Sequence, residues 1–342
     1  MTDEQSTSRN AAQPRYGRRP PKAAPALRLA SLLSGTLPPT PTAVDYGKRF
    51  TGWQMLGNDS AGDCVAVSWA NQRALVTTVL AEHTSYPTQD QVWQLYKTQN
   101  PQFDPAGSPS STGPGSPADQ GMEIQSALEY LVKTGGPDGV KAAAFAKVDH
   151  TDEAELRAAH AIFGQVWYGV NVQKANQSEF SGGKPWDYVA ASPIEGGHSI
   201  TGVGYDPKDY RFVTWARETM WTEAFRKHLV EEAWVVVWPE HFGAKEFQAG
   251  IDLGELAGLH EVRLAGARRR HHRRCLCRRR QPRHGRQRGV RRRREVQQGA
   301  WRGRPQRRPP AGAAGAAAAD VRPAGAGHVA SPRWLSRGTM AR

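Results

Sequence analysis

Two short strings of the sequence hold the residue types that acyl transfer requires. Cys64 ends the string Asn58 to Cys64 and opens a helix-like run, and His198 stands in Gly196 to Tyr205, ahead of a strand-like run. A cysteine in the first turn of a helix meets unpaired N–H groups and the positive end of the dipole, which favour the thiolate. An imidazole across a cleft can take the thiol proton and return it to a leaving group. The pair therefore predicts a thiol nucleophile with its base.

The elements around these residues follow from the spacing of apolar side chains. From Cys64 to Leu80 the residues Val65, Trp69 and Val76 recur with a helical period, and Asp63 is placed as the N-cap. Further helices are expected from Thr88, over 122–133, over 152–164 and over 222–230. Strands are expected over 165–172, 199–205, 211–215 and 233–238, which are rich in Val, Ile, Trp and Tyr. Helices first and strands second predict an α+β protein with two subregions and a cleft between them.

Composition divides the chain into parts. Residues 1–40 are polar and Pro-rich and read as a flexible arm, 41–242 as the folded domain, and 243–262 as a short extension. The tail, 263–342, carries 24 Arg and no Lys against one Glu and one Asp, whereas the rest holds 22 basic and 30 acidic residues. We expect this tail to be disordered. Non-specific nucleic-acid binding and an out-of-frame coding segment are two explanations for it.

Other functional classes have little support in the sequence. Cys64 is alone in the domain, which leaves no disulfide framework there, and Cys275 and Cys277 lie among like charges without a second ligand pair. We therefore expect no metal and no cofactor. The chain has no run of about 18 apolar residues and no secretory signal at its N-terminus, which predicts a cytoplasmic protein without a membrane partner.

Over roughly Pro41 to Pro239 the sequence resembles the papain-like cysteine peptidases. The matching features are, in order, Val44-Asp45-Tyr46, Asn58, Gly62-Asp63-Cys64, Asp119-Gln120-Gly121, Ala127 to Tyr130 and His198 to Tyr205. The resemblance implies a papain-like two-subdomain fold, with a helical N-terminal half that carries the nucleophile and an antiparallel β-rich C-terminal half. It also implies an oxyanion donor at Asn58, where the family has Gln, and a substrate edge at Gln120 and Gly121.

Three features depart from the family's pattern. Thr214-Trp215 resembles the pair that follows the family's His-orienting Asn, so that the matching position is Val213, which cannot accept a hydrogen bond through its side chain. Thr214 or Trp215 is then expected to support His198. Met122 replaces a glycine of the substrate edge and is expected to narrow it. The long inhibitory pro-region of the family has no evident counterpart.

These observations favour a papain-like thiol hydrolase, a peptidase or amidase that cleaves a peptide or another amide bond through an acyl-enzyme. Cys64 is the expected nucleophile and His198 the expected base. A catalytically impaired papain-fold binding protein is the alternative that Val213 suggests, and nucleic-acid binding through the tail is a third. The substrate and the oligomeric state are left open.

Overall fold

The computed structural model describes residues 15–22, 26–35 and 39–258, all within one unit of the chain, Met1–Gln281. Predictions for the Arg-rich tail and for Cys275 and Cys277 lie outside the described residues. The helices are α1 (Cys64–Leu80), α2 (Gln89–Lys97), α3 (Ile124–Lys133), α4 (Glu153–Phe163), α5 (Lys174–Ser181), α6 (Glu223–Leu229) and α7 (Lys245–Gly250), with 3-10 turns η1 (Leu29–Ser31), η2 (Gly47–Arg49) and η3 (Pro239–Gly243). The strands are β1 (Val44–Asp45), β2 (Ala144–Val148), β3 (Val166–Gln173), β4 (Ile194–Tyr205), β5 (Tyr210–Thr214), β6 (Arg217–Trp221) and β7 (Val230–Val237). Among the described residues, no helix is both long and apolar enough to cross a bilayer.

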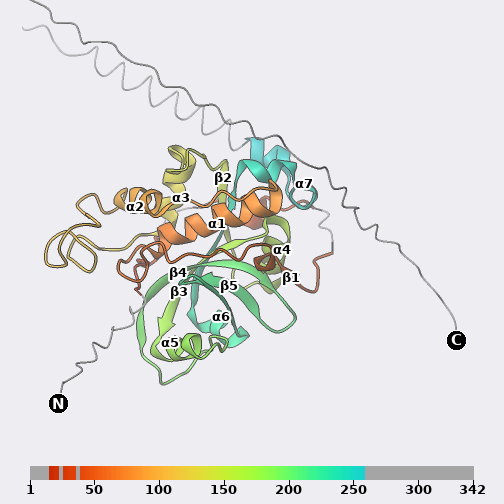
Figure 1. Cartoon of the computed structure of the whole chain (residues 1–342). Coiled ribbons are helices and arrows are strands. Elements are labelled where there is room, and N and C mark those ends of the chain that lie inside the picture. Colours follow the sequence, from red (N-terminus) through yellow and green to blue (C-terminus); the bar gives the residue numbers. More distant parts are fainter. Residues whose placement is uncertain (1–14, 23–25, 36–38, 259–342) are drawn as a thin grey trace, which may run out of the picture. The chain divides into compact units, whose positions relative to one another are not determined.

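The helix that begins at Cys64 lies in the middle of the molecule. In Figure 1, α1 runs between α2 and α3 on one side and strands β3, β4 and β5 on the other. Every residue from Cys64 to Thr77 is buried, not only the expected apolar face. The buried Arg73 is compensated by the carboxylates of Asp138 at 2.9 Å and Glu240 at 2.8 Å. The central helix can therefore hold a buried arginine, because a carboxylate from the turn after α3 and one from η3 reach it.

The strands form one antiparallel sheet in the order β2-β7-β3-β4-β5-β6, with β1 paired to β4. This arrangement confirms the expected α+β class with a helical first half and a β-rich second half. Two strands, β2 and β6, and two helices, α5 and α7, were not predicted from the pattern.

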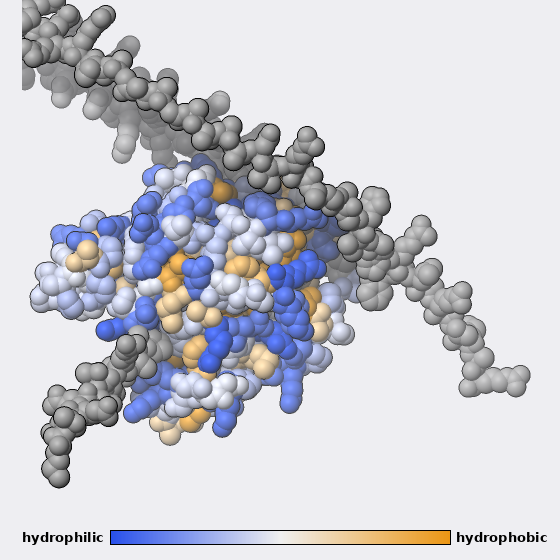
Figure 2. All heavy atoms as spheres, viewed as in Figure 1, coloured by the Kyte–Doolittle hydropathy of each residue, from blue (hydrophilic) through white to orange (hydrophobic). Residues whose placement is uncertain are grey.

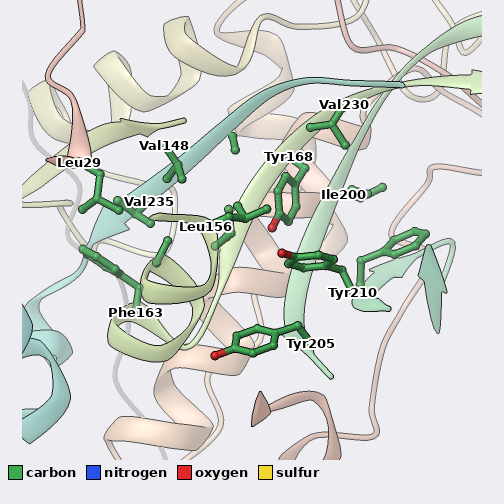
Figure 3. Close-up of a cluster of buried hydrophobic side chains, with 14 of the residues drawn as sticks. Leu29, Val148, Leu156, Phe163, Tyr168, Ile200, Tyr205, Tyr210, Val230 and Val235 are labelled. Carbon is green, nitrogen blue, oxygen red and sulfur yellow. The ribbon is translucent and has the colours of Figure 1, made fainter. Parts of the chain in front are cut away.

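Alternation along the strands divides the core between the two faces of the sheet. Trp167 and Trp234 face α1, α2 and α3, whereas Tyr168, Ala233 and Val235 face α4. Figure 3 shows the second cluster, in which Leu29 from η1 lies with Val148, Val235 and Phe163. On the face seen in Figure 2, hydrophilic residues prevail and hydrophobic ones form only small separate areas.

Both ends of the described chain pack against this core, which differs from the expected flexible arm and separate extension. Leu29 and Leu32 are fully buried before the expected domain start at 41. Phe247, Ile251 and Leu256 are buried after its expected end at 242, and Ser34 donates its N–H to the Gly250 carbonyl at 2.9 Å. The two segments are joined by backbone hydrogen bonds to each other. Because these partners are distant in the sequence, local composition did not show that either segment is folded.

Candidate functional site

Cys64 begins α1 at the point where this helix crosses β4. The Ser199 hydroxyl donates to the Ser68 hydroxyl at 2.9 Å, and the Thr201 hydroxyl donates to the Ser68 carbonyl at 3.2 Å, so that one turn of α1 is fixed on the strand. The Ser199 N–H points to the Cys64 thiol and favours its ionised form. The residue before Ser199 is His198. The fold therefore brings the two predicted residues to the same place.

The ionisation of Cys64 differs from the expectation. Although the thiol lies at a helix start, burial raises the pKa of Cys64 from 9.0 to about 12, and the N–H groups of Ser199 and Gly17 oppose this only in part. Desolvation of a fully buried thiol outweighs the helix dipole here. The preceding Asp63 caps α1 without a side-chain hydrogen bond, and burial raises its pKa well above the usual range.

His198 is fully buried and is held on two sides. Its Nε2 lies 2.6 Å from the Thr214 hydroxyl, and the Trp215 ring stacks on the imidazole with a centroid distance of 4.5 Å. Its Nδ1 has no hydrogen-bond partner among the described residues, Cys64 included. Burial, with the charge of Arg18, lowers the pKa of His198 to about 3, so the imidazole is neutral. If the hydroxyl accepts from Nε2, the lone pair of Nδ1 is free to take a proton.

Register explains why Thr214 contacts the histidine and Val213 does not. Neighbouring residues of a strand face opposite sides, and Val213 packs with Leu75 and Val203 in the interior. The β5–β6 hairpin then turns through Trp215 and Ala216, whose φ angles of 43° and 60° are both positive. The backbone of a residue other than glycine is strained at positive φ. The strain persists in the turn that places the indole over His198.

Asn58, the expected oxyanion donor, is buried at the other wall of the site. Its side-chain amide donates to the Ala61 carbonyl at 3.2 Å and to the Arg15 carbonyl at 3.3 Å. The amide is thus close to the loop that leads into Cys64, and a segment of the chain's own N-terminus occupies one of its hydrogen bonds.

The predicted substrate edge presents backbone groups of Met122 to the cleft, and the side chain of Met122 does not line the edge as expected. The Gln120 side chain is exposed and donates to the Pro117 carbonyl at 3.0 Å. Gly121 has a φ of +71°, and a Cβ there would lie 2.0 Å from the Gly17 carbonyl oxygen. The Met122 side chain is buried in the core and does not narrow the edge, whereas its backbone forms the edge's hydrogen bonds.

Five residues of the N-terminal segment 1–40, residues 15–19, lie in the cleft between these walls. The name arm is used only for these five residues below. On one wall the Gly17 carbonyl accepts from the Met122 N–H at 2.7 Å, and the Arg19 N–H donates to the Met122 carbonyl at 2.8 Å. On the other wall the N–H groups of Gly17 and Arg18 donate to the Gly197 carbonyl at 3.2 and 3.0 Å. This occupation differs from the expectation that nothing takes the place of an inhibitory pro-region.

Sequence reasoning assigned no role to three side chains that shape the site. Asp119 accepts from the Gly62 N–H at 3.0 Å and from the Tyr96 hydroxyl, which ties the loop before Cys64 to α2. Glu231 and Glu232 directly follow the expected helix 222–230, a position typical of solvated carboxylates, but Glu232 is fully buried on β7, where burial raises its pKa. No local pattern marks these residues, because their partners are distant in the sequence. The described part of the chain holds no group of three His, Cys, Asp or Glu suited to a metal ion.

No family model and no curated protein matches the chain. Solved structures do: the cysteine protease xylellain from Xylella fastidiosa is 16% identical with a TM-score of 0.48, over 65% of this chain and 95% of that one. The Carica candamarcensis cysteine protease CMS1MS2 is 14% identical (TM-score 0.41; 58% and 98% covered), and procathepsin B from Trypanosoma congolense is 11% identical (0.46; 66% and 86%). At these values the likeness says nothing about activity.

The topology and the site define the class of fold. A buried helix that starts at a cysteine packs on an antiparallel sheet whose strand β4 carries a histidine, in the order expected from the sequence. This arrangement agrees with the α+β architecture that the sequence predicted.

Proposed function

We propose that the protein is a papain-like thiol hydrolase that cleaves peptide or other amide bonds through an acyl-enzyme. The observation that supports this most is the setting of His198, whose Nε2 bonds to Thr214 at 2.6 Å under the Trp215 ring, on the strand that contacts the Cys64 helix. Cys64 attacks the substrate carbonyl while Nδ1 of His198 takes the thiol proton. The same proton then goes to the departing amine.

In this proposal Thr214 takes over the role of the Asn that orients the histidine in papain-like peptidases and that Val213 replaces here. Its hydroxyl holds the imidazole in the tautomer with the proton on Nε2, which leaves Nδ1 basic. Asn58 and the Cys64 N–H are the proposed donors to the oxyanion of the tetrahedral intermediate.

In this conformation the site is not ready to react. The Gly17 N–H faces the thiol, the Asn58 amide is bonded to the Arg15 carbonyl, and both Cys64 and His198 are neutral. Catalysis therefore requires the arm to leave the cleft, which hydrates the site and allows the thiolate and the imidazolium to form.

Labelling of Cys64 tests this proposal in a chain whose arm is displaced by Gly17→Val. A mild electrophile at pH 6 is expected to modify Cys64 much faster than a free thiol, and His198→Ala in the same background is expected to remove the excess. Equal labelling rates of Cys64 with and without His198→Ala would refute the assignment of His198 as the base.

A catalytically impaired binding protein of the same fold is the second candidate, favoured by the filled cleft and the neutral thiol. It predicts that Cys64→Ser leaves stability and ligand binding intact, with no thiol-dependent turnover in any background.

A further inference from the structure

The side chain of Arg18 enters a pocket that opens from the cleft next to His198. Its guanidinium donates to the Val170 carbonyl at 3.4 Å, and Val170 is the cross-strand partner of His198. The side chain is 1% exposed although it belongs to a segment outside the expected domain. An arginine buried this deeply needs compensating charge from the pocket.

Three polar side chains of the pocket supply that compensation. Glu232 accepts from Arg18 Nη1 at 3.3 Å, Asn171 Oδ1 accepts from Nη2 at 3.2 Å, and Glu231 forms an ion pair with Nη2. Two carboxylates and two carbonyl-type oxygens around one planar cation match the fork of N–H donors that distinguishes arginine from lysine.

The pocket is assembled by bonds that do not involve the arm. The Trp234 indole donates to Glu232 at 2.8 Å, and the Asn171 amide donates to Glu231 at 2.7 Å. Gly169 lies opposite Glu232, where a Cβ would come within 2.6 Å of the Glu232 Cγ and 2.7 Å of the Arg18 Cδ. The acceptors therefore hold their places when the guanidinium leaves, as a preorganised binding site requires.

The arm's backbone follows the path that leads a side chain into this pocket. Arg18 bridges Met122 on one wall and donates to the Gly197 carbonyl on the other, through main-chain groups that any peptide carries. A Cβ on Gly197 would lie 2.3 Å from the Arg18 carbonyl oxygen, so this wall is shaped for a peptide backbone. Another chain bound along the same walls would present a side chain to the same three residues.

We infer that Asn171, Glu231 and Glu232 form the specificity subsite of the cleft, that it takes an arginine side chain of a peptide substrate, and that Arg18 fills it while the arm occupies the cleft. This inference rests on the proposed hydrolase function. Departure of the arm leaves the buried Glu232 without the guanidinium of Arg18, and a buried carboxylate that has lost a cationic partner favours binding of another. Peptides with arginine at this position therefore compete with the arm, and those without it compete poorly.

Peptide binding to the full chain with Arg18→Ala tests the subsite. The probe is a fluorescent peptide with the sequence of residues 14–21, followed by anisotropy. Two variants of the probe lose one positive charge each, the first at the position of Arg18 and the second at that of the exposed Arg15. We expect the first loss to weaken binding by at least about 10-fold, as for hydrogen bonds to charged groups, and the second by less than about 3-fold. Glu231→Gln in the host protein is expected to reduce the difference.

Equal affinities of the two variants, or a difference that Glu231→Gln leaves unchanged, would overturn the subsite. If Arg18→Ala does not fold, Gly17→Val serves as the host, because it leaves every pocket residue in place, and the same ranking is expected. Hydrolysis by the Gly17→Val protein separates the two proposals: if it shows no Cys64-dependent cleavage but the ranking of the probes is intact, only the hydrolase is refuted.

Discussion

Substitution of Gly17 by valine is expected to expose the thiol that the arm covers. A Cβ at Gly17 would lie 1.8 Å from the Gly62 carbonyl oxygen, a separation that the rigid loop before Cys64 cannot accommodate. The arm therefore leaves the cleft, while the remainder of the fold keeps its contacts. Gly35→Val is the matched control, because nothing lies within 4 Å of a Cβ at that position.

The size of the effect follows from the ionisation of Cys64. Burial raises its pKa from 9.0 to about 12, which makes the thiolate about 1000-fold scarcer at pH 7. A more basic thiolate is also the better nucleophile, and this recovers about 20-fold. We therefore expect alkylation by iodoacetamide at pH 7 to be about 50-fold slower in the unaltered chain than in Gly17→Val, before any steric effect.

Peptide mapping of the alkylated protein provides the assay, because the chain also contains Cys275 and Cys277 and only the peptide with Cys64 is informative. Gly35→Val is expected to label at the unaltered rate. Equal rates at Cys64 in Gly17→Val and the unaltered chain, with circular dichroism unchanged, would refute the argument that the arm buries the thiol.

The pH profile gives an independent test of the same pKa. Since the pKa of buried Cys64 lies near 12, the thiolate fraction in the unaltered chain still rises about tenfold per pH unit between pH 7 and 10. In Gly17→Val the rate is expected to level off near or below the pKa of an exposed cysteine, about 8.5. A plateau at that pH in the unaltered chain would contradict the burial argument.

Three further substitutions test the supports of the site. Thr214→Val in the Gly17→Val background removes the hydroxyl at His198 Nε2, and we expect Cys64 labelling at pH 6 to fall about 10-fold or more; an unchanged rate removes Thr214 from the site. Arg73→Ala leaves two carboxylates without their buried cation and is expected to cost about 3–5 kcal/mol in urea unfolding; a loss under about 1 kcal/mol contradicts this. Ala216→Gly relieves a φ of 60° and is expected to stabilise by about 1 kcal/mol, whereas a destabilisation means that the turn is not strained.

Local patterns predicted the elements that carry the site. The Cys64–Leu80 helix was bounded correctly, and the helix expected from Thr88 begins one residue later, at Gln89, with Thr88 as its N-cap. Edge strand β6 (Arg217–Trp221) was missed because it is polar and mostly half-buried, so no apolar alternation marks it. The short strand β2 (Ala144–Val148) has two alanines among five residues, which weakens its strand signal.

Contacts between distant segments were beyond local reasoning. Arg18 and Glu232 are 214 positions apart, so the sequence around Glu232 does not show which cation compensates it. The choice between Thr214 and Val213 depended on which face of β5 looks toward His198, and register is set by the whole sheet. Gly17 follows Tyr16 and Gly197 precedes His198. These two glycines were the one signal in the sequence that another stretch of backbone packs closely at this place.

Peptide hydrolysis by the Gly17→Val protein tests the central claim most directly. We expect the displaced arm to allow cleavage of a peptide that carries arginine, measured by mass spectrometry at pH 7. Cleavage should disappear when Cys64→Ala or His198→Ala is added. Absence of any cleavage by a folded Gly17→Val protein, or cleavage that persists without Cys64, would contradict a thiol hydrolase closed by its own N-terminal arm.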